Sequence, residues 1–166
     1  MNVSFTNEFT LSKIDEIVSF LAGPRLMVRN TDYPDILDWF QKVSIQLASQ
    51  EKRAVIALDG AELSGVIIYQ RHRVIADALE IKNLTVRPQS AGRKMATFLM
   101  RAAETEGLRD FKTRKVLCDA KAGNIPVRMF LLWQGYLLAD HRDLYKKGAG
   151  IDSVFTKTTV PGLLQP

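Results

Sequence analysis

Residues 79–106, LEIKNLTVRPQSAGRKMATFLMRAAETE, decide the fold of this chain, because a strand passes there through a basic glycine turn into an amphipathic helix. The strand is predicted over 79–86, since Pro88 cannot donate to a strand ladder. Apolar residues recur from Met95 at helical spacing, and Gly107 is the predicted end of that helix. Strand, turn and helix are therefore expected to form one continuous unit.

The turn between this strand and this helix is suited to an anion. The first turn of a helix leaves backbone N–H groups unpaired at the positive end of the helix dipole. Three cations, Arg87, Arg93 and Lys94, lie beside those groups in the sequence. We therefore expect an anionic ligand here, with a solvated surface turn as the alternative, since a lone glycine turn is a weak motif.

The chain has 166 residues and a globular composition, which predicts one domain over 1–160 and a loose tail over 161–166. No apolar run approaches the roughly 20 residues of a membrane span, and the N-terminus lacks the features of a signal peptide, so a cytoplasmic protein is expected. The single cysteine, Cys118, is expected to be a buried thiol. His72 and His141 lack metal-ligand spacing, so no metal site is predicted.

The net charge of +5 is unevenly distributed along the chain. Residues 1–70 hold 6 Lys/Arg against 9 Asp/Glu, and residues 71–166 hold 17 against 9, so the two parts carry −3 and +8. Such asymmetry suggests a polyanionic partner, which would be a nucleotide cofactor, RNA, DNA or an acidic protein. A merely solvated basic face is the alternative.

Periodicity along the chain predicts the order β-α-α-β-β-β-α-β-α-β-β. Runs of strands beside isolated helices indicate an α+β or mixed α/β layered domain with a mainly antiparallel sheet. The expected strands lie at 3–5, 54–58, 65–69, 79–86, 115–120, 136–139 and 154–159. The expected helices begin at Ser12, near 32–34, at Met95 and at Asn124, and they end at Gly23, near Leu47, at Gly107 and at Gly135.

Two linked motifs in this order resemble those of the GNAT superfamily of acyl-CoA-dependent N-acyltransferases. One is EIKNLTVRP, at 80–88, with the turn that follows, and the other is NIPVRMFLLWQGY at 124–136. The resemblance covers roughly residues 3–160. It implies a GNAT-like fold, with a mixed, mainly antiparallel, twisted sheet of about seven strands flanked by four helices. It also implies acetyl-CoA as a substrate, with coenzyme A as product, and homodimers are common among its members.

The resemblance assigns the turn to the pyrophosphate of acyl-CoA. The matching positions are Ala91, Gly92, Arg93, Lys94, Met95 and Ala96, and the second motif adds Asn124. Lys94 stands where the family usually has glycine. Its backbone N–H and its charge suit a phosphate, but its Cβ is expected to crowd a close backbone approach.

The resemblance further implies that the strand ending at Val86 splays from the strand near Cys118. The backbone of Leu84, Thr85 and Val86 would then bind the pantetheine arm, and the Leu84 N–H would polarise the thioester carbonyl. Glu80 is the implied base, working best with a pKa raised by burial. The alternative is a glutamate exposed to solvent or paired with Lys82 or an arginine.

The acid that usually protonates the leaving thiolate is a tyrosine in the second motif, and Leu131 stands at its position. Tyr145 and Tyr136 are the candidate substitutes, although each is more often a packing residue. In a further alternative the thiolate leaves unprotonated, because a thiol pKa near 8.5 makes it a tolerable leaving group.

The resemblance thus favours an N-acetyltransferase acting on a primary amine of an unidentified acceptor. Residues 23–32 are expected to shape the acceptor pocket. One alternative is a catalytically impaired module that senses CoA or binds nucleic acid. Another is a toxin-type acetyltransferase acting on aminoacyl-tRNA, which generally keeps the tyrosine that is missing here.

Overall fold

The computed structural model describes residues 3–23, 33, 35–92, 94–145 and 149–159. Within these residues, seven strands form one mixed sheet in the order β1-β2-β3-β4-β5-β7-β6, accompanied by four α-helices and one 3-10 turn. The strands are β1 Val3–Thr6, β2 Arg53–Asp59, β3 Glu62–Arg71, β4 Ala78–Val86, β5 Lys115–Lys121, β6 Leu137–Arg142 and β7 Asp152–Thr158. The helices are α1 Leu11–Ala22, α2 Ile36–Ala48, η1 Pro88–Ser90, α3 Met95–Phe111 and α4 Ile125–Trp133. The predicted order of elements and the fold class are confirmed.

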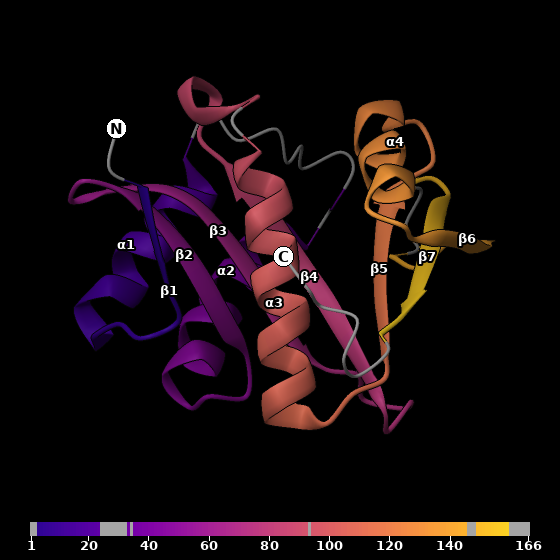
Figure 1. The fold of residues 1–166 in the computed structure, drawn as a ribbon, viewed down its shortest axis with the longest axis horizontal. Helices are drawn as coiled ribbons and strands as arrows, with labels where there is room; N and C mark the ends of the chain where they lie inside the picture. Colours follow the sequence, from indigo (N-terminus) through magenta and orange to yellow (C-terminus); the bar gives the residue numbers. More distant parts are fainter. Residues whose placement is uncertain (1–2, 24–32, 34, 93, 146–148, 160–166) are drawn as a thin grey trace.

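The sheet consists of two antiparallel groups of strands. Strands β1 to β4 pair antiparallel in sequence order, and β7 pairs antiparallel with both β5 and β6. The two groups meet only where β4 and β5 run parallel, which requires the long crossover through α3. Figure 1 shows α3 lying along β4, with α4 beside the far end of β5.

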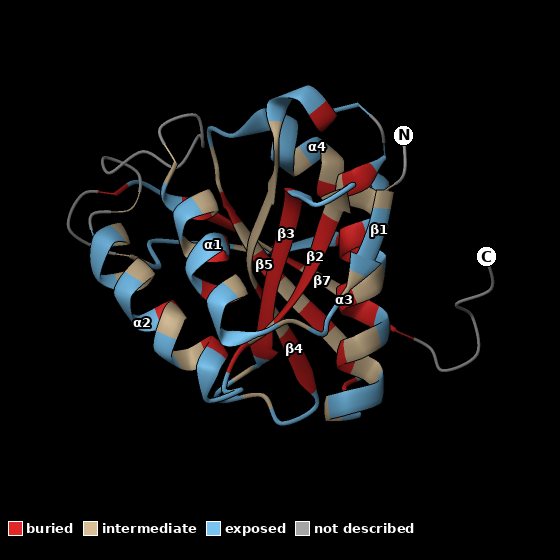
Figure 2. Ribbon diagram, turned by 90° about the vertical axis from the view of Figure 1, so that its left-hand side faces the viewer, coloured by how far each residue is buried: buried red, intermediate tan, exposed pale blue. Residues whose placement is uncertain are grey.

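Helices cover both faces of the sheet. Figure 2 shows the buried strands between α1 and α2 on one side and α3 on the other. Apolar side chains such as Ile14 and Val43 pack with Ile68 under α1 and α2, while Leu99 packs with Leu79 under α3. The face under α1 and α2 also carries polar side chains of β3, β4 and β5, and these form the site described below.

Cys118 is buried, as predicted. It lies on the α3 face of β5, where burial raises the pKa of its thiol. A thiol held protonated in an apolar core is a packing group and a poor nucleophile.

The predicted end of α3 at Gly107 is wrong. The helix continues to Phe111 and stops at Lys112, which takes the left-handed conformation with φ 52°. Gly107 serves packing instead, because a Cβ at this position would lie 2.6 Å from Leu79 Cδ2. The predicted cap of α1 at Ser12 is also displaced, since the N-cap is Thr10 and its hydroxyl pairs with that of Ser12.

The β2–β3 hairpin is tighter than predicted. The strands extend to Asp59 and Glu62, so only Gly60 and Ala61 remain between them. Gly60 has φ +64°, the left-handed conformation that such short turns require. Within the described residues, no helix is long and apolar enough to cross a bilayer.

Candidate functional site

Strands β4 and β5 share a short contact and then separate. Their register pairs are Ala78 with Lys115, Leu79 with Val116 and Glu80 with Leu117. Beyond Glu80, β4 continues to Val86 with β3 as its neighbour on one edge. Figure 1 shows the two strands diverging toward the start of α3 and toward α4. One edge of β4 is therefore open next to the turn that precedes α3.

Backbone N–H groups of β4 point into this opening. The Arg87 N–H donates to the Ser64 carbonyl at 2.8 Å, which shows that residue 87 faces β3. N–H groups alternate in direction along a strand, so that of Thr85 also faces β3 while those of Leu84 and Val86 face away from it. The splay expected between β4 and β5 thus leaves two donors on the open edge.

The start of α3 lies at the same end of the sheet. Gly92 has φ +78° and Lys94 has φ +57°, so both adopt the left-handed conformation. Lys94 reproduces the backbone shape that glycine adopts easily, in spite of its Cβ. The Lys94 carbonyl accepts from the Phe98 N–H at 3.0 Å, and the amides of 95–97 have no partner within the described part of the chain.

The turn is less cationic than the sequence suggests. The Arg87 guanidinium pairs with the Glu62 carboxylate at 2.6 Å, so its charge is largely compensated. The Ala91 N–H is used within the turn, because it donates to the Pro88 carbonyl at 3.1 Å. Arg93 lies outside the described residues. Among the described residues, the donors without a partner at this turn are those of the first turn of α3, with the exposed side chain of Lys94 beside them.

Side-chain contacts hold the two sides of the opening together. Gln134, after α4, donates to the Thr97 hydroxyl of α3 at 3.2 Å. Deeper in the core, Glu104 of α3 accepts from the Tyr136 hydroxyl at 2.7 Å and from Lys157 Nζ at 2.8 and 3.0 Å. These contacts define the separation of α3 from β7 and from the turn before β6.

Neither Leu131 nor Tyr136 supplies an acid at the opening. Leu131 is buried in the core under α3. Tyr136 is buried beside Glu104, and this burial, together with the nearby carboxylate, raises the pKa of its hydroxyl. Asn124 caps α4, since its side-chain oxygen accepts from the Val127 N–H at 3.4 Å.

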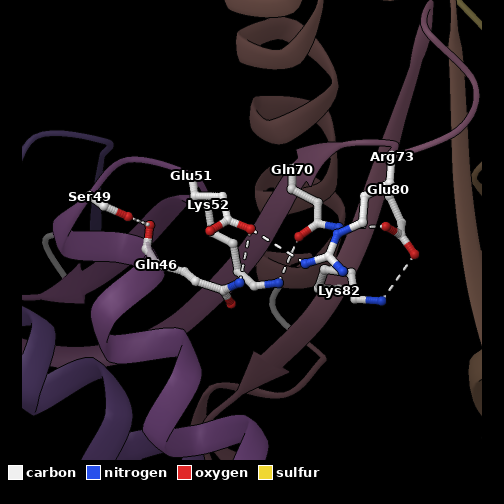
Figure 3. Close-up of polar contacts among 8 residues, drawn as sticks. All are labelled: Gln46, Ser49, Glu51, Lys52, Gln70, Arg73, Glu80 and Lys82. Carbon is white, nitrogen blue, oxygen red and sulfur yellow. Dashed lines mark hydrogen bonds and ion pairs between the residues drawn. The ribbon is translucent and has the colours of Figure 1, made fainter.

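Glu80 lies at the last register pair of β4 and β5, within a row of polar side chains (Figure 3). Its Oε2 accepts from the Gln70 amide at 2.7 Å, and its Oε1 accepts from Lys82 Nζ at 3.0 Å. Burial raises the pKa of the carboxyl, but the Lys82 charge and the hydrogen bonds from Lys82 and Gln70 outweigh it, so the pKa is lowered. The raised pKa expected for Glu80 is wrong, and the paired alternative fits.

Lys52 stands behind Gln70 in the same row. Its ammonium donates to Gln70 Oε1 at 2.7 Å, which fixes the orientation of the Gln70 amide toward Glu80. Burial, with repulsion from Lys82, lowers the pKa of Lys52 to about 8. The row Lys52, Gln70, Glu80, Lys82, which we call the Glu80 row, thus alternates donors and acceptors across β3 and β4.

Asp119 of β5 is a functional candidate that the sequence did not reveal. Its side chain lies on the same side of the sheet as that of Glu80. Burial raises the pKa of the Asp119 carboxyl, although the Lys82 charge and the hydrogen bond from Tyr145 act to lower it. Tyr145 donates to Asp119 Oδ2 at 2.9 Å. Alternation along β5 places Asp119 on the face of the sheet opposite to Cys118. The β4–β5 register, in which Glu80 pairs with Leu117, shows that Glu80 lies on the same face as Asp119.

The Tyr145 side chain already contacts Asp119 and Lys121. Burial and the Asp119 carboxylate raise the pKa of its hydroxyl. Lys121 Nζ lies 4.7 Å from the centre of the Tyr145 ring and 5.0 Å from that of Tyr33, and it pairs with Asp152 at 2.9 Å. A tyrosine with a raised pKa releases its proton with difficulty, which weakens the expectation that Tyr145 acts as an acid.

Comparisons with known proteins agree on the architecture. No family model and no curated protein matches the sequence. A Desulfovibrio desulfuricans protein assigned to the GNAT family of acetyltransferases superposes with a TM-score of 0.79 at 12% identity, covering 96% of this chain and 100% of that one. A variant of the spermidine N-acetyltransferase of Vibrio cholerae gives a TM-score of 0.69 at 12% identity, covering 94% and 93%.

A third similar structure contains acetyl coenzyme A. A Bacillus anthracis protein assigned as a streptothricin acetyltransferase, in complex with acetyl coenzyme A, superposes with a TM-score of 0.58 at 14% identity, covering 65% of this chain and 62% of that one. At these identities the likeness establishes the fold. The chain therefore has the same fold as these acetyltransferase structures.

Proposed function

We propose that this protein is an acyl-CoA-dependent N-acetyltransferase that transfers an acetyl group from acetyl-CoA to a primary amine. The observation that carries the proposal is the opening between β4 and β5. On its open edge the N–H groups of Leu84 and Val86, and at the start of α3 the amides of 95–97, have no partner within the part of the chain that the structure describes. An elongated ligand with a phosphate group at one end and an amide-containing arm fits such a row of donors.

In this proposal acetyl-CoA lies along the open edge of β4. The amides of Met95 and Ala96 bind the pyrophosphate, and the Lys94 ammonium adds a charge. The backbone of Leu84, Thr85 and Val86 holds the pantetheine arm. Gly92 keeps the turn in the left-handed conformation and Ala91 completes it. Arg93, which lies outside the described residues, is proposed as a further ligand of the pyrophosphate. Asn124 contributes by capping α4 on the other side of the opening.

The chemistry follows from the groups at the inner end of the opening. A neutral amine attacks the thioester carbonyl, a C–N bond forms, and the C–S bond breaks with release of coenzyme A. The Leu84 N–H stabilises the negative charge that develops on the carbonyl oxygen. Glu80 accepts the proton that the amine loses. Because its pKa is lowered, Glu80 is ionised at neutral pH and ready to accept a proton, although it is a weaker base than a carboxylate with a raised pKa.

The leaving thiolate has no obvious acid partner among the described residues. Leu131 has no proton to donate, and the hydroxyls of Tyr136 and Tyr145 are held by carboxylates. We propose that the thiolate leaves unprotonated or takes its proton from water, which its pKa near 8.5 permits. Tyr145 is then a residue that positions Asp119.

The decisive experiment measures binding and turnover separately. Calorimetry with acetyl-CoA reports binding, and thiol release over a panel of amines reports turnover. Glu80→Gln is expected to leave acetyl-CoA binding unchanged and to lower kcat/KM by about 100-fold or more. Glu16→Gln, an exposed carboxylate of α1, is the matched control and is expected to behave as wild type.

Two results would contradict the proposal. Acetyl-CoA binding without turnover of any amine by the wild-type protein would favour the CoA-sensing alternative. Equal turnover by Glu80→Gln and wild type would remove Glu80 from the reaction. A dimer, an aminoacyl-tRNA acceptor and a cytoplasmic location stay predictions, and the acceptor loop at 24–32 and the tail at 161–166 lie outside the described residues.

A further inference from the structure

The Glu80 row points to a class of acceptor, and this inference rests on the proposed function. We propose that the acceptor carries an anionic group on the carbon next to its primary amine, with an α-amino acid as the simplest example. Lys82 would bind the anionic group while Glu80 receives the proton from the amine. Lys82 is thus assigned as the residue that determines acceptor specificity.

The charge of Glu80 is already compensated within the protein. Lys82 Nζ lies 3.0 Å from Glu80 Oε1, and the Gln70 amide occupies the other oxygen at 2.7 Å. A carboxylate with two such partners offers little attraction to a second cation. A polycationic acceptor would therefore gain little from Glu80 and would meet repulsion from Lys82.

Both lysines and carboxylates contribute charge on this face of the sheet. The lysines are Lys52, Lys82 and Lys121, and the carboxylates are Glu80, Asp119 and Asp152. Asp152 is fully buried and paired with Lys121, and the pKa of Asp119 is raised by burial. These three carboxylates already accept hydrogen bonds or ion pairs, from Gln70 and Lys82 at Glu80, from Tyr145 at Asp119 and from Lys121 at Asp152.

Lys82 has more hydrogen-bond donors on its ammonium than the described residues use. Its ammonium has three donors, and the only hydrogen bond it makes within the described residues goes to Glu80. Its side chain is 21% exposed, so a ligand can reach it. Asp119, on the other side of the opening, also lies within its electrostatic influence. Lys82 therefore stands at the opening with donors to spare.

The geometry of the pair matches that of an α-amino acid. Figure 3 shows the Glu80 carboxylate and the Lys82 ammonium next to each other at the end of the row. In an α-amino acid the amine and the carboxylate are joined to one carbon atom, so they also lie next to each other. Placed in the opposite sense, the acceptor carboxylate accepts charge-assisted hydrogen bonds from the Lys82 ammonium, and the acceptor amine faces Glu80, which takes the proton that the amine loses.

The test uses pairs of amines that differ only in the carboxylate. Tyrosine and tyramine, histidine and histamine, arginine and agmatine, and ornithine and putrescine form such pairs, and spermidine is added as a polycation. Thiol release from acetyl-CoA is measured for each. For the best pair, the amino acid is expected to exceed its decarboxylated partner at least tenfold in kcat/KM.

Variants locate the preference at Lys82. In Lys82→Met the ratio is expected to fall close to one, while Lys82→Arg keeps part of it. Lys42→Met, which removes an exposed lysine of α2, is the matched control and should keep the wild-type ratio. Unchanged acetyl-CoA affinity in calorimetry shows that Lys82→Met is folded.

The outcomes separate the two levels of the proposal. Faster turnover of the decarboxylated amines or of spermidine would overturn the inference about the acceptor and leave the acetyltransferase proposal intact. A ratio that Lys82→Met does not change would remove Lys82 from acceptor recognition. Acetyl-CoA binding with no thiol release from any amine would overturn the acetyltransferase proposal, and this inference with it.

Discussion

Removing the charge of Lys157 should strongly destabilise the protein, because it leaves Glu104 buried without a counter-ion. Glu104 is 1% exposed and accepts from Lys157 at 2.8 and 3.0 Å and from Tyr136 at 2.7 Å. In Lys157→Met the Glu104 carboxylate keeps only the hydrogen bond from the Tyr136 hydroxyl among these three. The free energy of unfolding is expected to fall, and the apolar replacement does not itself open a large cavity.

The magnitude follows from the burial of the two partners. Breaking a fully buried ion pair on one side costs about 3–5 kcal/mol. The Lys157 side chain is 25% exposed, so water partly reaches its position and the lower end of that range applies. For a domain of this size, about 3 kcal/mol corresponds to a fall of roughly 6–12 °C in Tm. Glu104→Leu combined with Lys157→Met should recover much of the loss, since no buried charge is then left.

Urea unfolding of the four proteins in this double-mutant cycle measures these differences. Lys13→Met is the control, because Lys13 forms an exposed pair with Glu16 in α1 and should change stability by no more than about 0.5 kcal/mol. A Lys157→Met protein as stable as the control would refute the reasoning. So would a double variant that is less stable than Lys157→Met alone.

Three further predictions concern single positions. Lys94→Gly should raise the free energy of unfolding by about 0.5–1 kcal/mol in urea melts, because it removes the cost of a left-handed Lys94, whereas Lys94→Ala keeps that cost and should bring no gain. Gly107→Ala should destabilise by about 1–3 kcal/mol despite its helical position, since its Cβ would overlap Leu79; a stabilised variant would contradict the packing. The pKa of Lys52 is lowered from 10.5 to about 8 in the folded state, so the unfolded state binds more protons between these two pH values. The free energy of unfolding of the wild type should therefore rise with pH, relative to that of Lys52→Met, from about pH 8 to pH 10.5. A difference between the two proteins that stays constant over this range would contradict the assignment.

Local patterns predicted the elements well and the contacts between them poorly. The apolar spacing from Met95 onward and the alternation over 79–86 were sufficient for α3 and β4. The prediction from Gly107 was wrong, because a glycine at the end of an apolar stripe predicts the end of the helix. Gly107 is instead required for packing against Leu79, which is far away in the sequence.

The chemical state of the site depended on register. Glu80 was recognisable from its place in the motif, but its lowered pKa results from Gln70 on the neighbouring strand as well as from Lys82. Asp119 had no local signal, since a charged residue that alternates with apolar ones predicts a solvent-facing position. It is the β4–β5 pairing at Glu80 and Leu117 that places Asp119 on the face of the Glu80 row.

The short contact between β4 and β5 also has a consequence for the way this chain folds. Each antiparallel group of strands is built largely from neighbours in sequence, whereas the junction between the groups consists of three register pairs and requires a 17-residue helix to be in place. Contacts that close long loops form late in folding. We expect the junction to be the last part of the sheet to assemble. The open edge of β4 would then take its final form only when the two separately formed groups of strands join.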